Sequence, residues 1–500
     1  MNKKKFYITT PIYYPSAKPH MGHAYSSIAS DVIARFKRID GYDVFFLTGT
    51  DEHGLKIQRA AEEQNSDPLS FCDKISQTFI DLSNTLNLSN TDFIRTTEER
   101  HKNTVKKLWS LLQENDQIYL SKYAGWYSVS DEAYYLENEV EELDGKKISK
   151  SSGSEVTWME EESFFFKLSE WQQPLLDFYK NNPDFIQPES RKNEVISFVS
   201  GGLKDLSVSR TTFDWGIDVP NNKKHVMYVW LDALTNYLSA TNYFDNHSGF
   251  WPANVHIIGK DILRFHAVYW PAFLMAAKIP IPKKIFGHGW ILSGEEKMSK
   301  SKGNILDPLE LINQYGSDEI RYYLMRDVIF GLDGKINIDN LRITLNDLAN
   351  NIGNLSNRIF TILNKNYKCK VPQINDGYTI NSDLLVDKKT IIQYIDQYEL
   401  HNYTKFIHSY SSTINKYVND NEPWNKKNNS EQNIKNILFS TLIALKNIFI
   451  LLYPVMPIVS IKFLKSLNIN ENEIKIDNIN EKLTINDQLT KPDILFKKYE

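Results

Sequence analysis

Cysteine is nearly absent from this chain, and the shortage excludes two kinds of stabilisation. Only Cys72 and Cys369 occur among 500 residues. Two cysteines so far apart in sequence build neither a disulfide framework nor a four-cysteine zinc site. A reducing, cytoplasmic location is the simplest interpretation.

The chain also lacks a strong excess of charge of either sign. Its 58 Lys and Arg residues stand against 62 Asp and Glu residues, which gives a formal net charge of -4. If the partner is a nucleic acid, its phosphates must therefore meet local basic patches rather than a cationic body. The net charge itself neither supports nor excludes RNA binding.

Long uninterrupted hydrophobic runs are missing as well. The basic residues 3–5 are followed too soon by Pro11 and polar residues for a signal peptide, so export is not expected. The most apolar stretch, residues 437–457, predicts a buried helix of a helical bundle rather than a membrane span. Its apolar run is interrupted by Ser440, Thr441, Lys446 and Asn447.

The first residues have a β-α-β order. Residues 6–10 are β-branched and aromatic and predict a strand, which a turn-rich loop follows. From His20 the apolar positions recur at helical spacing as far as Arg38, and a second strand is expected at residues 44–48, before the loop 49–54. This order predicts a parallel sheet with its site at the carboxyl ends of the strands.

The rest of the chain changes character several times. Short aromatic and polar strands at residues 124–135 and 151–166 indicate a domain inserted into the first fold. The parallel pattern is expected to resume at residues 227–237, 255–261 and 285–289, and amphipathic helices to follow from 346 to about 465, before an irregular tail. The expected domains are an α/β domain in two halves, 1–115 and 225–295, an inserted α+β domain at 116–224, a connector at 296–345 and an α-helical domain at 346–500.

The first motif with chemical potential is His20-Met21-Gly22-His23, at the start of the first helix. The backbone N–H groups and the positive dipole end of a helix favour an anion there, and two histidines three positions apart add donors. Gly22 allows a base or phosphate to approach the backbone closely. Taken alone, such a pair is more often a helix cap or a surface feature.

The second motif is Lys297-Met298-Ser299-Lys300-Ser301, followed by Gly303 and Asn304. Two lysines in a Ser- and Gly-rich loop are suited to closing over a polyphosphate as mobile point charges. The alternative is a solvated basic loop. Both motifs supply cationic donors without a nucleophile, which suits transfer of a phosphate or nucleotidyl group.

The two motifs resemble the HIGH and KMSKS signatures of class I aminoacyl-tRNA synthetases. Residues 11–19 and 51–54 are similar to the methionyl-tRNA synthetase family at the same offsets. The resemblance extends over nearly the whole chain. It implies a Rossmann-like catalytic domain, the lysine loop in the connector, and an α-helical anticodon-binding domain. It also implies ATP-dependent charging of methionine-specific tRNA, initiator and elongator, through a methionyl-adenylate, with Mg²⁺ accompanying the ATP.

Residues 228–237 and 261–266 match the stretches that line the methionine pocket in this family. The resemblance implies that Asp51 pairs with the substrate ammonium group. A thioether packs well against aromatic faces, at roughly 0.3–1.5 kcal/mol per sulfur–aromatic contact. Ordinary core aromatics are the alternative. The implied pocket consists of Ile12, Tyr14, Trp230, Ala233, Leu234, Tyr237 and His266.

On the ATP side, the resemblance implies that His20 and His23 stabilise the α-phosphate transition state while Lys297 and Lys300 hold the pyrophosphate. Arg210 resembles an arginine near the phosphates in the family, and a purely structural arginine is the alternative. The other ATP-side residues that the resemblance implies are Gly22, Gly259, Lys260, Asp261 and His288.

One region departs from many relatives. Zinc-bearing members of the family hold cysteine clusters where residues 125–166 of this chain have no cysteine. A polar and aromatic turn is expected to replace the metal, so no structural zinc is expected.

In the helical part, residues 354–358 and 422–424 resemble the anticodon readers of the family. The resemblance implies that Trp424 stacks on an anticodon base and that Asn354 and Arg358 bind base edges, as single-stranded RNA is read. A capping Asn, a surface Arg and a packed Trp are the alternative. Without the C-terminal β-barrel that often carries the dimer contact in this family, a monomer is expected.

Two rival functions remain. A synthetase for Ile, Leu or Val would need a much larger editing insertion than about 110 residues, and a non-catalytic tRNA-binding relative would not need both motifs intact. Methionine-dependent ATP–pyrophosphate exchange separates the three.

Overall fold

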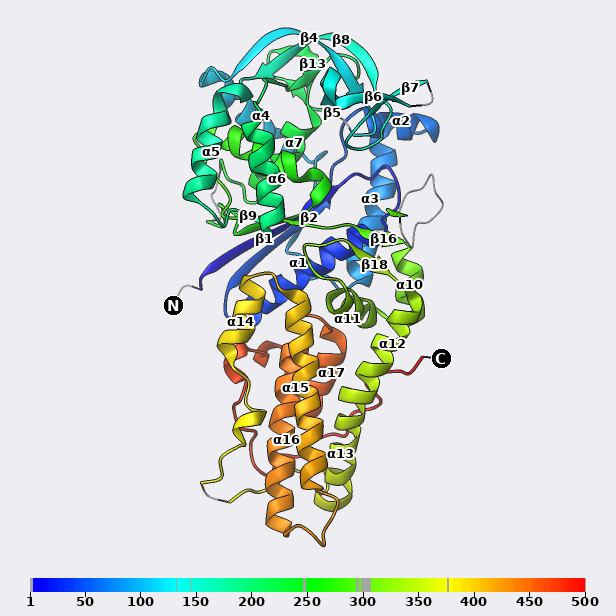
Figure 1. The fold of residues 1–500 in the computed structure, drawn as a ribbon, viewed down its shortest axis with the longest axis vertical. Helices are drawn as coiled ribbons and strands as arrows, with labels where there is room; N and C mark the ends of the chain where they lie inside the picture. Colours follow the sequence, from blue (N-terminus) through cyan, green and yellow to red (C-terminus); the bar gives the residue numbers. More distant parts are fainter. Residues whose placement is uncertain are drawn as a thin grey trace.

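A computed structural model of the protein describes residues 3–131, 133–143, 145–245, 249–293, 296–297, 307–375 and 377–499. The molecule is elongated, with a mixed α/β half above an α-helical half (Figure 1). The central sheet crosses the upper half, and α1 lies beneath it, facing the helical half.

The central sheet has six parallel strands in the order β3-β2-β1-β14-β15-β9. Both of its faces are buried: Phe6 and Ile8 of β1 pack in the cluster that contains α1, while Tyr7 packs in the cluster on the opposite face. Such double burial is typical of parallel sheets. The strands are β1 (Lys5–Tyr13), β2 (Asp43–Thr50), β3 (Asp92–Arg95), β9 (Ile186–Gln187), β14 (Val255–Gly259) and β15 (Ile285–His288).

Helices cover this sheet and complete the expected α/β fold. The β1-α1-β2 prediction is confirmed, because α1 runs from Met21 to Ile39 between two parallel strands. The helices of this half are α1 (Met21–Ile39), α2 (Leu55–Glu63), α3 (Pro68–Thr85), α4 (Glu99–Glu114), α7 (Val229–Leu234), α8 (Asn236–Ser239) and α9 (Trp270–Ala276).

Antiparallel strands form the top of the molecule, where an inserted domain was expected (Figure 1). One strand of this region differs from the prediction, since β9 pairs with β15 at the edge of the central sheet. The elements are β4 (Ile118–Ser128), β5 (Ala133–Tyr135), β6 (Val140–Leu143), β7 (Lys146–Ser149), β8 (Thr157–Phe166), α5 (Gln172–Asn181), α6 (Glu189–Ser200), β10 (Leu206–Ser207), β11 (Ser209–Arg210), β12 (Asp218–Val219) and β13 (Asn222–Met227).

The prediction of a parallel strand at residues 227–237 is wrong. Met227 ends β13, which is antiparallel to β11 and β12, and the following residues form the short helices α7 and α8. Every residue of both helices is buried. A short apolar run buried on all sides has the composition of a buried strand, and periodicity cannot separate the two.

The lower half consists of a small connector and a helical bundle. The connector contains β16 (Ile291–Ser293), β17 (Glu296–Lys297), α10 (Pro308–Tyr315), α11 (Ser317–Asp327) and β18 (Gly334–Ile336). The bundle contains α12 (Ile338–Leu348), α13 (Asn354–Tyr367), α14 (Lys388–Asp396), α15 (Leu400–Asn421), α16 (Glu431–Leu452) and α17 (Pro457–Ser466).

Among the described helices, α16 has the length and apolar composition of a membrane-crossing segment, and 89% of its most apolar window is buried inside the protein. It packs against α15, α17 and α13. The expectation of a buried bundle helix is therefore confirmed.

A buried arginine that pairs with α1 holds this helix against the connector and the helical bundle. Nη2 of Arg321, on α11, donates to Asp31 of α1 over 2.6 Å, and Nε of the same arginine donates to the Val455 carbonyl, between α16 and α17, over 2.8 Å. Both charged side chains are fully buried. The helix that begins at the expected site is thus held against the connector and the bundle.

Candidate active site

The expected site residues converge at one edge of the central sheet. β1 ends at Tyr13, β2 at Thr50, β14 at Gly259 and β15 at His288, and α1 begins beside them at Met21. β2 lies on one side of β1 and β14 on the other. This reversal of strand order is the point at which open α/β sheets bind ligands.

The histidine motif forms the first turn of α1. The Gly22 amide donates to Nδ1 of His20 over 3.0 Å, and the His20 amide donates to Nδ1 of His23 over 3.0 Å. The two rings stack with their centroids 3.8 Å apart. Because each Nδ1 accepts a hydrogen bond, each neutral ring carries its proton on Nε2 and offers that N–H as a donor.

The capping alternative is part of this arrangement. His20 is the N-cap of α1 and forms a reciprocal capping box with His23. Burial, with the nearby side chains of His20 and Lys56, holds the pKa of His23 well below its usual range, so this ring is neutral at pH 7. A side chain at Gly22 would come within 2.8 Å of Cε1 of His20, so glycine leaves room for the imidazole.

Asp51 follows β2 directly and is 2% exposed. Its amide donates to the Tyr13 carbonyl over 2.9 Å, which joins the ends of β1 and β2. The neighbouring Glu52 is fully buried and accepts two bonds from Arg95, over 2.6 and 3.0 Å. The loop that carries Asp51 is therefore buried and firmly held.

The expected methionine pocket is an aromatic cluster. Trp230 of α7 stacks on Phe265 with centroids 3.8 Å apart and lies edge-on to Tyr14 and His266. Ala233 and Leu234 are buried on the same helix, and Ile12 is half-buried on β1. The structure thus brings the aromatic members of the predicted pocket together and adds Phe265, which the prediction had not singled out.

His266 has a fixed orientation within this cluster. It lies in a π-helical segment, Phe265–Tyr269, a distortion that often marks functional sites. Nδ1 lies 3.0 Å from the Ile262 carbonyl and Nε2 lies 2.8 Å from the Tyr237 hydroxyl, so Nδ1 donates and Nε2 accepts. Burial lowers the pKa of His266 to about 4, and the ring is neutral at pH 7.

A buried triad lies on the other side of α7. Asp232 is fully buried, and its two oxygens accept bonds from Nδ1 of His53 and Nε2 of His101, each over 2.7 Å. Burial alone would raise the pKa of the Asp232 carboxyl, but the charge of His53 and the hydrogen bonds from both histidines hold it at about 2. Sequence reasoning missed this triad.

The expected ATP-side residues lie at the ends of β14 and β15. His288 is buried, and its Nε2 lies 2.7 Å from the Ser26 hydroxyl of α1. Lys260 donates to Asp333 over 2.7 Å, and Trp290 donates through Nε1 to Asp261 over 3.3 Å. These contacts connect the sheet edge to the connector.

The lysine motif begins in β17 of the connector. Lys297 is the last residue of that strand, which is antiparallel to β16. Beyond its place in the strand, the Lys297 side chain lies outside the described residues, as does all of Lys300.

Arg210 lies away from this edge, in β11. It is 1% exposed, donates to the Ser207 hydroxyl over 2.9 Å, and faces the rings of Tyr127, Tyr134 and Tyr228 at 4.5–5.5 Å. These contacts favour the structural alternative for this arginine over a phosphate contact.

Two of the three expected anticodon readers, Arg358 of α13 and Trp424 after α15, are in contact in the helical bundle. The Arg358 guanidinium lies 5.2 Å over the ring of Trp424, which is 48% exposed, and donates to Asn419 over 3.0 Å. Asn354 lies one helical turn before Arg358 and is exposed. The exposure of Trp424 argues against the alternative of a packed core tryptophan.

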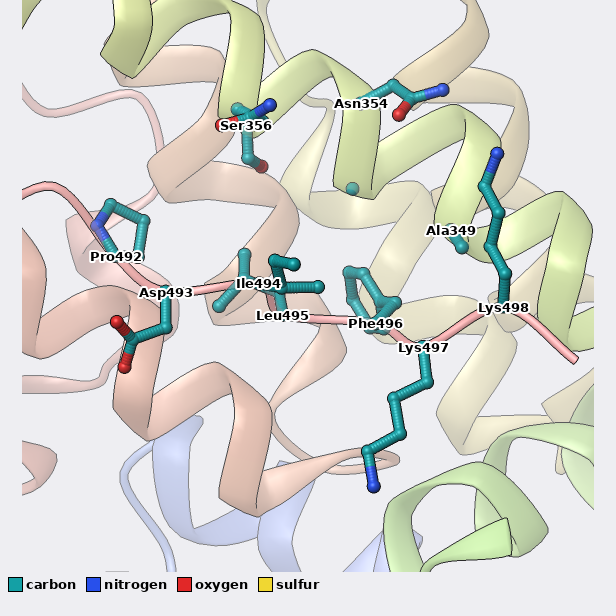
Figure 2. Close-up of a pocket in the computed structure, with 12 residues that line it drawn as sticks. Ala349, Asn354, Ser356, Pro492, Asp493, Ile494, Leu495, Phe496, Lys497 and Lys498 are labelled. Atoms are coloured by element: carbon teal, nitrogen blue, oxygen red, sulfur yellow. The ribbon is translucent and has the colours of Figure 1, made fainter.

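A cavity of about 530 Å³ lies between α13 and the C-terminal segment, away from the sheet edge (Figure 2). Asn354 lines it together with residues 492–498. The cavity is therefore lined by one expected anticodon reader, Asn354, and by none of the expected catalytic residues.

No group of three or more His, Cys, Asp and Glu suited to a metal ion is found among the described residues. Within residues 125–166, Asp131 accepts bonds from the hydroxyls of Tyr135 and Ser154, over 2.8 and 2.9 Å. Polar and aromatic side chains are thus joined by hydrogen bonds in this part of the chain.

Comparisons with known proteins give a consistent picture. Residues 6–360 match the family described as tRNA synthetases class I (M). The chain is 49% identical to the methionine–tRNA ligase of Rickettsia prowazekii, over 99% of this chain and all of that protein, and 47% identical to that of Brucella suis, over 91% and 90%. It is also similar to the structure of Mycobacterium tuberculosis methionyl-tRNA synthetase in complex with methionyl-adenylate, with a TM-score of 0.95 and 43% identity over 99% of both chains.

Proposed function

The chain belongs to the methionine–tRNA ligases, class I aminoacyl-tRNA synthetases, and from this premise we propose which residues carry each step of the reaction. The enzyme attaches L-methionine to tRNA through a methionyl-adenylate. The methionine carboxylate attacks the α-phosphorus of Mg-ATP, and pyrophosphate leaves. The 2′- or 3′-hydroxyl of the terminal adenosine then takes the methionyl group, and AMP leaves.

His20 and His23 stabilise the charge that develops on the α-phosphate. Their Nε2–H groups are the donors, since both Nδ1 atoms accept backbone bonds within the first turn of α1. The helix N-terminus adds its own N–H groups and dipole. Preorganised donors of this kind act without the cost of reorganising water.

Methionine occupies the aromatic cluster beside α7. Trp230, Tyr14 and His266 offer ring faces and edges to the thioether, and the neutral His266 suits an uncharged side chain. Asp51 pairs with the ammonium group from the end of β2. The remaining pocket members are Ile12, Ala233, Leu234 and Tyr237.

Lys297 and Lys300 hold the pyrophosphate from the loop that leaves β17. Lys260, Asp261, Gly259 and His288 bind ATP at the ends of β14 and β15, with Gly22 at the start of α1. Arg210 is retained only as a candidate for the phosphates, because its tyrosine contacts support a structural role.

The helical bundle reads the anticodon of methionine-specific tRNA, both initiator and elongator. Trp424 stacks on a base while Asn354 and Arg358 bind base edges, which the exposure of Trp424 and the position of Arg358 over its ring support. We further propose a cytoplasmic monomer without structural zinc. The turn around Asp131 supports the last point.

The arrangement of the two histidines is the observation that carries the catalytic assignment, and a matched pair of variants tests it. His23→Gln keeps an amide N–H near the Nε2 position, whereas His23→Asn keeps only the acceptor near Nδ1. Loss of one such donor costs about 10²–10³ in rate. Single-turnover adenylate formation should therefore fall by about that factor in His23→Asn and much less in His23→Gln. Equal rates in the two variants would remove His23 from the catalytic group.

A further inference from the structure

The buried triad His53–Asp232–His101 has no part in the reaction described above. All three side chains are at most 3% exposed. A fully buried carboxylate with hydrogen-bonded partners is weak evidence for stability, because well-packed apolar residues of similar size are often as stable or more stable. The position of this one in the fold therefore suggests another purpose.

Asp232 lies on the face of α7 opposite to the expected pocket. Trp230, Ala233 and Leu234 are spaced at i, i+3 and i+4 and share one face of the helix, while Asp232 projects about 150° away from the centre of that face. Its carboxylate accepts from His53 on one side and from His101 of α4 on the other. Asp232 therefore fixes the rotation of the helix that carries the pocket wall.

His53 belongs to the loop of Asp51, and this loop is anchored one residue at a time. The Asp51 amide donates to the Tyr13 carbonyl over 2.9 Å, the Glu52 amide to the Thr96 hydroxyl over 2.9 Å, and the Gly54 amide to the Trp215 carbonyl over 3.0 Å. His53 supplies the bond to α7. This bond spans the gap between the expected ammonium-binding carboxylate and the expected thioether pocket.

We propose that Asp232 and His53 are positioning residues that set the distance between Asp51 and the methionine pocket, and so make methionine affinity depend on binding both ends of the amino acid at once. The proposal rests on the proposed roles of Asp51 and the α7 residues. His101 has a different part in it. Its Nδ1 lies 3.0 Å from the Ser239 hydroxyl of α8, so it ties Asp232 to the scaffold and not to the Asp51 loop.

Replacement by Asn and by Gln at each position distinguishes the role of His53 from that of His101, because the two histidines donate through different nitrogens. His53 donates through Nδ1, so His53→Asn keeps a donor in place and His53→Gln moves it away. His101 donates through Nε2, so the same substitutions act in the opposite sense: His101→Gln keeps the donor and His101→Asn loses it. Each damaging variant thus has a polar control at the same position.

The measurements are the KM values for methionine and for ATP in pyrophosphate exchange, the inhibition constant of a methionine analogue that lacks the amino group, and the thermal midpoint of unfolding. His53→Gln should raise the KM for methionine by about tenfold, since misplacement by about 1 Å can cost up to a hundredfold. The KM for ATP and the inhibition constant of the deaminated analogue should change by no more than about twofold. His53→Asn should stay close to the wild-type chain in all four.

His101→Asn should lower the thermal midpoint with a smaller change in the KM for methionine, because the His53 bond remains. The proposal is overturned if His53→Gln raises the KM for methionine and for ATP equally, if it weakens the deaminated analogue as much as methionine, or if His53→Asn is as damaged as His53→Gln. Failure of the proposed function gives a different result, since the wild-type chain would then show no methionine-dependent exchange. If His53→Gln does not fold, the KM for methionine is compared between His53→Asn and His101→Asn. A larger rise in His53→Asn than in His101→Asn contradicts the proposal.

Discussion

Replacement of Trp424 by alanine separates anticodon reading from structural support. The indole is 48% exposed and contacts the Arg358 guanidinium at 5.2 Å. Base–aromatic stacking is worth roughly 1–3 kcal/mol per base, so Trp424→Ala should lower the efficiency of tRNA charging by about tenfold or more. Methionine-dependent pyrophosphate exchange should be unchanged, because the expected adenylation residues lie at the edge of the central sheet.

The partial exposure of Trp424 also limits how much free energy of unfolding Trp424→Ala can cost. About half of an indole surface of roughly 150–250 Å² is buried, and at about 25 cal/mol per Å² this amounts to no more than about 2–3 kcal/mol. A partly exposed cation–π contact adds about 0.5–1 kcal/mol. A fully buried tryptophan would cost about 3–5 kcal/mol instead.

The assay measures exchange, tRNA charging and the thermal midpoint on one preparation of each variant. Trp424→Phe keeps an aromatic face and should retain most of the charging, and Ile458→Ala, at a 54% exposed position elsewhere in the bundle, controls for loss of exposed apolar surface. A parallel loss of exchange and charging in Trp424→Ala would refute the reasoning and make Trp424 a structural residue. Unchanged charging would refute it as well.

Three further predictions concern charge, pH and metal. Asp51→Asn should weaken methionine while leaving ATP and a deaminated analogue nearly unaffected, and equal losses for methionine and the analogue in competition assays would refute the ammonium pairing. Burial raises the pKa of Glu319 from 4.5 to about 7. Between these pH values the folded chain retains a proton that the unfolded chain has lost, so the free energy of unfolding falls as the pH rises from about 4.5 to about 7. Glu319→Gln should thus raise the free energy of unfolding by up to about 3 kcal/mol at pH 8 and hardly at pH 4, measured by urea unfolding, whereas a gain of the same size at both pH values would contradict this. Elemental analysis should find no stoichiometric zinc, and a chelator should leave the unfolding curve in place; one tightly held zinc per chain would overturn the metal-free proposal.

Local patterns in the sequence were sufficient for the elements with clear periodicity. The β1-α1-β2 unit was predictable because its strands are rich in β-branched and aromatic residues, and because the apolar positions of α1 recur at helical spacing. The same reasoning failed at residues 227–237, where two short helices are buried on every side and show no amphipathic pattern. It also missed β9, whose two residues are too short for any periodic signal.

The site was predictable where its residues lie within motifs and not where they pair across the chain. His20 and His23 lie in the first turn of α1, and a resemblance to a family identifies them directly. His53 and Asp232 lie 179 positions apart, and no local pattern indicates that one forms a hydrogen bond with the other. Arg210 is a different case, since the resemblance predicts phosphate binding, whereas the three tyrosine rings around the guanidinium favour the structural alternative.

Methionine-dependent ATP–pyrophosphate exchange by the purified chain tests the central claim most directly. Under the proposed assignments, the exchange depends on the methionine pocket, the histidine pair and the two lysines together, and it is expected without tRNA. The account predicts exchange with L-methionine and little with isoleucine, leucine or valine. Exchange that depends on another amino acid, or no exchange with any amino acid while the chain still binds tRNA, would contradict it.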